Sequence, residues 1–412
     1  MQAVIGAALA LTVVAGCSTK GAGAGGEKTG SDGVKTDYGV TKDKIVLGDL
    51  TDHSAAFKIS GLSLAHGYEV WVDEVNKAGG ICGRQIAIDS RDMGYVTEKA
   101  VSLYAGMKDD VLGMINLLGS PMIAALKSSL VTDQMVFVPD SWASSNLDTE
   151  LAMMIGGSYD IEIINGLSYL QSAGKISDGD KIGHIYVDSE YGQNGLVGSK
   201  FYAEKHGMKI IEAKLTGSDV DLAPTITKMK SEGVKALLLS TTPTQSGAAA
   251  TQSQNQGLDV PLHGNNPSFD STLLDTPAAG ALISQFTMSN YAVPFSDPAM
   301  AKVAKAYVAN TTDPPNKTAA YGYSSGLVWQ QILETACADK DLTRPNIVKK
   351  ANALKEIDTG GITSKLDFSL KGQPSSRASF ILKPDKGNAG GLATVKPDFA
   401  SAEAKAYKTP FQ

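Results

Sequence analysis

Hydrogen-bonding side chains gather at the points where short apolar runs of this sequence end. Six such segments are rich in hydroxyl and amide groups: TDHSAAF, GSPM, PDSWASSN, DSEYGQNG, STTPTQ and GNNPSFD. Hydroxyls and amides both donate and accept hydrogen bonds, so together they suit the recognition of a small polar molecule. Any one segment taken alone is more typical of an ordinary solvent-exposed loop.

The sequence carries no constellation of residues that catalysis would need. It has no GxSxG, HExxH or GxxxxGK[ST] motif, and its histidines stand singly at His53, His66, His184, His206 and His263. The segment GAGAGG at 21–26 has no apolar strand before it and no helical pattern after it, so it is a poor phosphate loop. The cysteines are too few and too far apart for a zinc site of the usual kind. We therefore predict a protein that is not an enzyme and holds no cofactor or metal.

The N-terminus has the pattern of an exported protein. Residues 3–16 are apolar but fall short of the roughly 20 residues that span a bilayer, and they end at Cys17. Val14 to Cys17 resemble the lipobox of bacterial lipoproteins, in which the cysteine becomes the lipidated N-terminus. We predict a signal peptide over 1–17, a flexible linker over 18–43, and an extracytoplasmic protein anchored to the outer face of the cell membrane. A buried N-terminal helix with a core cysteine is the alternative.

Length and charge narrow the fold and the ligand. A chain of 412 residues with 42% hydrophobic residues can build two cores. The net charge is −6, and no cluster of Lys or Arg stands out. Nucleic acid and anionic membrane surfaces are therefore poor partners, and a neutral or zwitterionic small molecule fits better.

The apolar pattern predicts parallel sheets with crossover helices. Short β-branched runs at 44–50, 84–92, 111–118 and 135–141 alternate with segments of helical periodicity. A second series of the same kind starts after residue 158 and includes a predicted strand at 282–290, and antiparallel strands are expected in the C-terminal part. Because open α/β sheets bind ligands at the carboxyl ends of their strands, the six polar segments are expected to meet in a cleft.

Seven segments in this order resemble the branched-chain (Leu/Ile/Val) amino acid binding family of type I periplasmic binding proteins of ABC transporters. They are KIVLGDL, HGYEVWVDEVNKAGGICGRQI, MINLLGSPMIAAL, IGHIYVDSEYGQNG, GSDVDLAPTITKMKSEGVKALLL, QNQGLDVP and AAYGYSSGLVWQQILETA. The resemblance covers nearly all of residues 44–370. It implies an α/β fold of two doubly wound lobes with parallel central sheets, joined by a three-segment hinge in a Venus-flytrap arrangement.

The resemblance also implies where the lobes divide. The first lobe would combine 44–157 with 291–361, and the second 158–290 with 362–412. The chain would cross between them near 156–160, 288–292 and 360–364. Cys82 and Cys337 would then share a lobe, which favours a disulfide between them over two separate buried thiols.

The family's binding positions fall on residues of the polar segments. Ser120 matches the serine that holds the ligand carboxylate, and Ser141 with Ala143 match contacts after the fourth strand, with Ser144 as an alternative. Phe57 and Tyr191 match aromatic walls of the two lobes, although both residue types are also common in cores.

Two positions depart from the family. Asn266 stands where amino acid binders carry the acid that pairs with the ligand ammonium, and Thr242 stands where an aromatic is expected. An unpaired buried ammonium is costly, so a free α-amino acid is disfavoured unless another acid, Asp52, Asp140 or Asp270, takes over. Trp142 could stack on a ligand or pack beneath its loop.

The resemblance implies partners as well as a ligand class. The ligand would be a small polar carboxylate, an amino-acid-like molecule or an amide, with carboxylates or amides lacking an ammonium preferred over leucine. The protein would be a monomer that serves an ABC permease and its ATPase. A sensor of the same fold that signals to a membrane or regulatory partner remains the alternative at this point.

Overall fold

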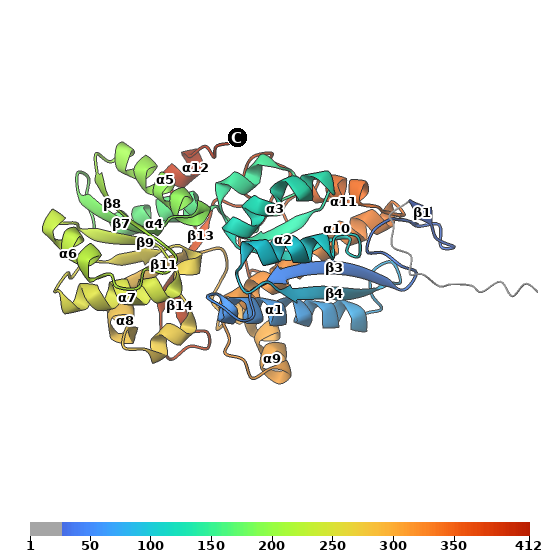
Figure 1. The fold of residues 1–412 in the computed structure, drawn as a ribbon, viewed down its shortest axis with the longest axis horizontal. Helices are drawn as coiled ribbons and strands as arrows, with labels where there is room; N and C mark the ends of the chain where they lie inside the picture. The colour runs from blue at the N-terminus through green and yellow to red at the C-terminus, as the bar shows by residue number, and fades with distance from the viewer. Residues whose placement is uncertain (1–26) are drawn as a thin grey trace, which may run out of the picture.

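The computed structural model describes residues 27–412. The predicted signal peptide, the lipobox ending at Cys17 and residues 18–26 lie outside the described residues. The remainder forms two lobes side by side along the long axis of the molecule (Figure 1). The prediction of a two-lobed α/β fold is confirmed.

The first lobe is built on a four-stranded parallel sheet in the order β4-β3-β5-β6. Every residue of β5 is buried, as expected for the apolar run GMINLL in the middle of a sheet covered on both faces. The strands are β3 Lys44–Thr51, β4 Gln85–Asp92, β5 Gly113–Leu118 and β6 Phe137–Asp140.

Helices from two distant parts of the chain cover this sheet. The longest two, α1 and α10, pack against each other, and α10 also packs on β5. The helices are α1 Lys58–Lys77, α2 Thr97–Ala105, α3 Ser120–Thr132, α9 Ala301–Asn310, α10 Thr318–Ala338 and α11 Arg344–Ala351, with short 3-10 turns η1 Ser144–Asp148 and η4 Pro298–Met300.

The second lobe contains a seven-stranded sheet in the order β14-β13-β11-β10-β9-β7-β8. It is parallel from β11 to β8, and the C-terminal strands β13 and β14 are added antiparallel at one edge. The strands are β7 Lys181–Val187, β8 Lys209–Leu215, β9 Ala236–Ser240, β10 Leu262–Gly264, β11 Phe286–Asn290, β13 Ser379–Pro384 and β14 Leu392–Phe399.

Helices and short turns accompany this sheet (Figure 1). They are α4 Tyr159–Ser172, α5 Glu190–Lys205, α6 Ala223–Glu232, α7 Pro243–Asn255 and α8 Ala279–Gln285, with η2 Asn266–Ser268, η3 Ser271–Asp275 and α12 Ala402–Ala406. The predicted strand at 282–290 begins only at Phe286, because residues 279–285 form α8. Ala281 and Leu282 are both buried and the next two residues are both exposed, which is the pattern of a helix face, whereas a strand alternates residue by residue.

The end of the predicted linker is ordered, which corrects the expectation for residues 27–43. β1 Lys28–Thr29 and β2 Lys35–Thr36 form a hairpin, and β2 pairs with β12 Asp341–Leu342 of the first lobe. The buried Arg84 pairs with Asp32 at 2.6 Å. Val34 is also buried, an apolar contact that the Gly-rich composition of the predicted linker did not indicate.

The chain passes between the lobes three times, and the three passages contact one another. Ala292 pairs with Thr363 in an antiparallel bridge, and the Val293 N–H donates to the Ile362 carbonyl at 2.9 Å. Gly156 of the first passage lies against Tyr291 of the second, and its N–H donates to the hydroxyl of Ser375, beyond the third passage, at 3.0 Å. These contacts form the three-segment hinge that the resemblance implied.

Within residues 27–412, no helix combines the length and the apolar character needed to cross a membrane.

Candidate functional site

A cavity lies between the two lobes at the carboxyl ends of the first-lobe strands. The first lobe contributes Phe57, Ser60, Tyr95, Leu118, Gly119, Ser120, Asp140, Lys317 and Thr318, and the second contributes Tyr159, Tyr191, Asn266 and Pro267. The space open to water inside the cavity is about 40 Å³. One water needs about 10–15 Å³ by this measure, so the cavity holds about three. A larger ligand therefore enters only when the lobes move apart.

Ser120 reaches the cavity because β5 turns abruptly into α3. Gly119, between the strand and the helix, has φ 98, a left-handed conformation that favours glycine. A Cβ at this position would also overlap the Met122 side chain. The turn brings the N-terminus of α3 to the cavity, where free N–H groups and the helix dipole favour an anionic group.

Aromatic rings from both lobes form the walls. Phe57 lies against Tyr95 with ring centroids 4.7 Å apart, and Tyr159 lies against Tyr191 at 4.6 Å. Tyr95 has φ 56, which is rare for a non-glycine residue. Such strain is commonly held at ligand sites, where surrounding contacts maintain it. Tyr95 and Tyr159 were not singled out from the sequence, because a tyrosine in a loop or at a helix start has no distinguishing pattern.

Lys317 places an ammonium group in this aromatic cavity. It immediately precedes α10, its side chain is 2% exposed, and its Nζ donates to the Phe269 carbonyl of the second lobe at 2.6 Å. Burial lowers the pKa of Lys317 to about 8, while Asp270, Asp140 and Glu162 oppose that shift. Sequence reasoning missed this residue, because nothing in the letters NKTAAYGY distinguishes a buried lysine from a surface one.

Asp140, at the end of β6, is the acid that lines the cavity. Burial raises its pKa to about 7, Lys317 lowers it in part, and Asp49 adds to the rise. The other two acids considered from the sequence are engaged elsewhere. Asp52 accepts N–H bonds from Ala55 and Phe57, and Asp270 caps η3.

A glutamate lies one layer behind Asn266. Glu162 accepts hydrogen bonds from the Asn266 side chain at 2.9 Å, the Asn266 backbone N–H at 3.1 Å and the Asn265 side chain at 3.0 Å. Burial raises the pKa of Glu162 to about 8, and these donors lower it in part. The residue is absent from the cavity lining, so its effect on a ligand passes through Asn266.

Four of the residues carried over from the resemblance line the cavity: Phe57, Ser120, Tyr191 and Asn266. Ser141 lies directly behind, fully buried, with its hydroxyl oxygen 2.6 Å from that of Ser120. It can orient the Ser120 hydroxyl, but it does not line the cavity.

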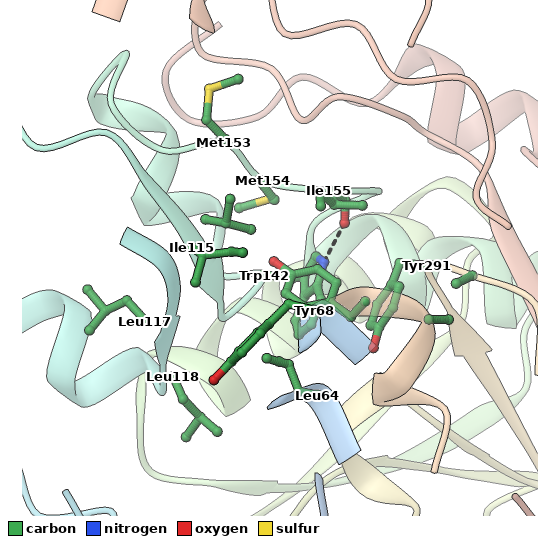
Figure 2. Close-up of a cluster of buried hydrophobic side chains, with 14 of the residues drawn as sticks. Leu64, Tyr68, Ile115, Leu117, Leu118, Trp142, Met153, Met154, Ile155 and Tyr291 are labelled. Atoms are coloured by element: carbon green, nitrogen blue, oxygen red, sulfur yellow. Dashed lines mark hydrogen bonds between the residues drawn. The ribbon is translucent and has the colours of Figure 1, made fainter. Parts of the chain in front are cut away.

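Trp142 packs beneath its loop and does not line the cavity, so of the two placements considered from the sequence the ligand-stacking one is not observed. Its indole is stacked on Tyr291 with centroids 4.5 Å apart, and Nε1 donates to the Ile155 carbonyl at 2.7 Å (Figure 2). Both partners belong to the hinge region. Trp142 therefore links the end of β6 to the hinge.

Ala143, Ser144 and Thr242 also lie outside the cavity lining. Ser144 faces the other lobe, where its hydroxyl accepts from the Asn194 side chain at 2.6 Å. Thr242 forms a capping box with Gln245 at the start of α7. Its hydroxyl accepts the backbone N–H of Gln245 at the helix terminus, which explains why a polar residue stands where an aromatic was expected.

Direct hydrogen bonds close the lobes on both sides of the cavity. On one side, Asn194 of α5 donates to Ser144 and accepts from the Ser144 N–H at 3.1 Å. On the other side, Asn316 donates to Asp270 at 3.0 Å, next to the bond from Lys317 to Phe269. The cavity is thus enclosed by contacts that must break for a ligand to enter.

Cys82 and Cys337 form a disulfide with Cα atoms 5.8 Å apart. It joins the turn after α1 to the end of α10 within the first lobe. In the part of the chain that the structure describes, no group of three or more His, Cys, Asp or Glu residues is arranged to hold a metal ion.

The chain is similar to known proteins in sequence and in fold. Residues 44–389 match the family described as periplasmic binding protein. A solved structure titled fatty acid ABC transporter substrate-binding protein, from Thermomonospora curvata, is 35% identical with a TM-score of 0.90, covering 93% of this chain and 99% of that chain. No match was found among the curated proteins.

More distant solved structures share the fold. A branched-chain amino acid ABC transporter protein from Thermus thermophilus with bound valine is 13% identical, with a TM-score of 0.76 over 89% of this chain and 99% of that chain. A substrate-binding periplasmic protein from Ralstonia solanacearum is 21% identical, with a TM-score of 0.74 over 85% of this chain and 99% of that chain. At these identities the similarity concerns the fold alone.

Proposed function

The chain belongs to the periplasmic binding protein family and is of the ABC transporter type, and on this premise we propose that it captures a small carboxylate bearing an apolar group and delivers it to an ABC permease. The capturing unit comprises the lobes 44–157 with 291–361 and 158–290 with 362–412. A lipid on Cys17 anchors the protein outside the cell membrane. The partner ATPase supplies the energy of transport, and the binding protein acts as a monomer.

The observation that carries the ligand class is the buried ammonium of Lys317 within aromatic walls. A buried cation needs an anionic partner, because charge taken out of water without one costs several kcal/mol, on the order of its desolvation energy. The rings of Phe57, Tyr95, Tyr159 and Tyr191 offer apolar surface to the rest of the ligand. The relative from Thermomonospora curvata, named for fatty acids, supports the same chemistry at 35% identity.

A free α-amino acid fits this cavity less well. Its ammonium would lie near Lys317, and the side-chain nitrogen of Asn266 already donates to Glu162. Asp140 would have to be ionised to pair with it, and burial opposes ionisation. Carboxylates without an ammonium are therefore the preferred ligands.

The test is a binding screen on the mature protein. Isothermal titration calorimetry would compare straight-chain carboxylates from acetate to decanoate, their primary amides, and the amino acids leucine and valine. We expect a carboxylate to bind with a Kd of about 1 μM, or about −8 kcal/mol, and leucine to bind at least about tenfold more weakly, a difference of about 1.4 kcal/mol.

A matched pair of lysine variants makes the screen specific. Lys317→Met should lose carboxylate affinity by about 100-fold, or about 2.7 kcal/mol, because the ligand charge is then unpaired. Lys302→Met changes a lysine that is 71% exposed on α9 and should bind as the wild type does. Tighter binding of leucine than of every carboxylate, or full affinity in Lys317→Met, would refute the proposed ligand class.

A further inference from the structure

Asp140 is an acid without a hydrogen-bond donor. It is the acidic side chain of the cavity lining, and no N–H or O–H of residues 27–412 donates to its carboxyl group. The contrast with Asp52, in the neighbouring loop, is informative. The carboxylate of Asp52 accepts backbone N–H bonds at 3.0, 2.7 and 2.8 Å, from Ser54, Ala55 and Phe57. Asp140 lacks such donors, which are what stabilise a buried negative charge.

Lys317 lines the same cavity without pairing with Asp140. The described residues show no ion pair between them, although their charges act on each other. One N–H of the ammonium is used by the Phe269 carbonyl, so two others remain for a ligand. An acid and an ammonium that share a small cavity without touching leave room for a group that contacts both.

We propose that Asp140 is protonated in the ligand complex and donates its O–H to one oxygen of the ligand carboxylate, while Lys317 donates an N–H to the other oxygen. This inference rests on the proposed function, because it requires a carboxylate in the cavity. No covalent bond to the ligand forms. When Asp140 is ionised in the free protein, the proton comes from solvent, so each binding event takes up one proton.

The groups around Asp140 determine the pH range of this effect. Two charged groups interact with Asp140, Asp49 on β3 and Lys317 just before α10. Four tyrosines do so as well: Tyr95 in the β4–α2 turn, Tyr159 on α4, Tyr291 after β11 and Tyr321 on α10. Burial raises the pKa of each of these tyrosines, so they stay neutral. The charge of Asp49 is compensated by hydrogen bonds from Tyr68, Ser90 and Asn116, which the carboxyl of Asp140 lacks.

The sign of the pH dependence follows from the raised pKa of Asp140, about 7. Below that pH the acid already carries its proton, and the cavity is ready for a carboxylate. Above it, binding must first protonate Asp140, so affinity falls by up to about tenfold per pH unit. A zwitterion would show the opposite trend, because its ammonium pairs with the ionised form.

The experiment compares hexanoate binding to the wild type and to Asp140→Asn from pH 6 to pH 8. Asparagine donates an N–H where the protonated acid donates an O–H, so the variant should bind within about threefold of the wild type at pH 6. Between pH 7 and 8 the wild type should lose about tenfold more affinity than the variant. Asp73→Asn, a surface change on α1 at an aspartate whose side chain is 55% exposed, should follow the wild type.

Proton uptake provides the second readout. Titrations at pH 8 in two buffers of different ionisation enthalpy should give less proton uptake for Asp140→Asn than for the wild type, by up to about one proton. The difference is at most one proton because removing the Asp140 charge lowers the pKa of Lys317, which moves part of the uptake to that ammonium. Parallel pH curves, equal proton uptake, or norleucine binding that strengthens with pH and exceeds hexanoate would overturn the inference. If the wild type binds no carboxylate of the series at any pH, the proposed function itself fails.

Discussion

Two histidines of the second lobe, His184 and His263, are fully buried with uncharged hydrogen-bond partners. His184 has hydroxyl partners on both ring nitrogens, Ser199 at 2.8 Å and Ser240 at 3.0 Å. His263 is held in the same way by Thr287 at 2.9 Å and Ser289 at 3.0 Å. Burial lowers the pKa of both to about 3. Protonation therefore opposes folding at these two positions.

These histidines make the second lobe sensitive to acid. Between about pH 6.5 and 3 the unfolded chain binds more protons than the folded one, so stability falls as the pH drops below 6.5. Each histidine contributes up to about 1.4 kcal/mol per pH unit. Chemical denaturation from pH 6.5 to 4.5 should show a shallower loss in His184→Gln than in the wild type.

The half-buried His206 supplies the control for this measurement. Its ring pairs with Asp178 at 2.9 Å near the surface. His206→Gln leaves both buried rings in place, so the part of the slope that they cause should persist, and the raised pKa values of Asp140 and Glu162 affect all three proteins alike. An unchanged slope in His184→Gln would contradict the assignment of a neutral buried ring.

At the level of residues, the sequence predicts which loops form the site better than it predicts which charged side chains line it. The loops that follow predicted strands could be located, and within them the family resemblance singled out Phe57, Ser120, Tyr191 and Asn266, all of which line the cavity. Lys317 could not, because side-chain burial depends on packing between distant segments, which periodicity does not record. Trp142 illustrates the same limit, since only the fold decides that its ring stacks on Tyr291.

Among the elements, strands and helices of the parallel sheets were the most predictable. Their apolar runs and helical faces are continuous, so the pattern survives burial on both sides. The predictions were wrong where an element depends on contacts with distant residues. The hairpin of β1 and β2 is held by Arg84 and β12, and α8 replaces the first part of a predicted strand.

The packing of α1 on α10 depends on glycines at the crossing. A Cβ on Gly322 of α10 would overlap the Leu64 carbonyl, and one on Gly67 of α1 would overlap the Ala319 carbonyl. Backbone cannot move aside as a flexible side chain can. Gly322→Ala should therefore lower the free energy of unfolding by about 1–3 kcal/mol, measured by urea denaturation.

Gly280 provides a matched control in a different helix. It lies in α8, and a Cβ there would have nothing within 4 Å. Gly280→Ala should raise stability by about 0.5–1 kcal/mol, because alanine has less backbone freedom to lose on folding. If both variants shift stability alike, helix propensity rather than the α1–α10 contact governs Gly322.

Across the whole molecule, ligand capture depends on contacts outside the cavity as much as on its lining. The lobes are linked by the hinge, by Asn194 with Ser144, and by Lys317 with Phe269. Only Lys317 among these also faces the ligand. Asn194 does not line the site. Its amide joins the lobes and also bonds within the second lobe to Asp160, which is next to Tyr159 of the lining.

Asn194→Ala tests whether closure and binding are coupled. Removing its two hydrogen bonds to Ser144 costs the closed form about 1–2 kcal/mol. The apparent Kd rises as the closed fraction falls, so carboxylate affinity should drop, by at most about 5- to 30-fold. Small-angle scattering should show a larger radius of gyration for the variant without ligand and recovery to the wild-type value at saturation.

Gln193→Ala, an adjacent change whose side chain contacts only Asp188 of its own lobe, should alter neither quantity. Because Asn194 also bonds to Asp160 beside Tyr159, the scattering measurement decides the cause. A loss of affinity together with a larger radius of gyration indicates the closure equilibrium, whereas equal affinity in the two variants would mean that the Ser144 contact forms without contributing to capture.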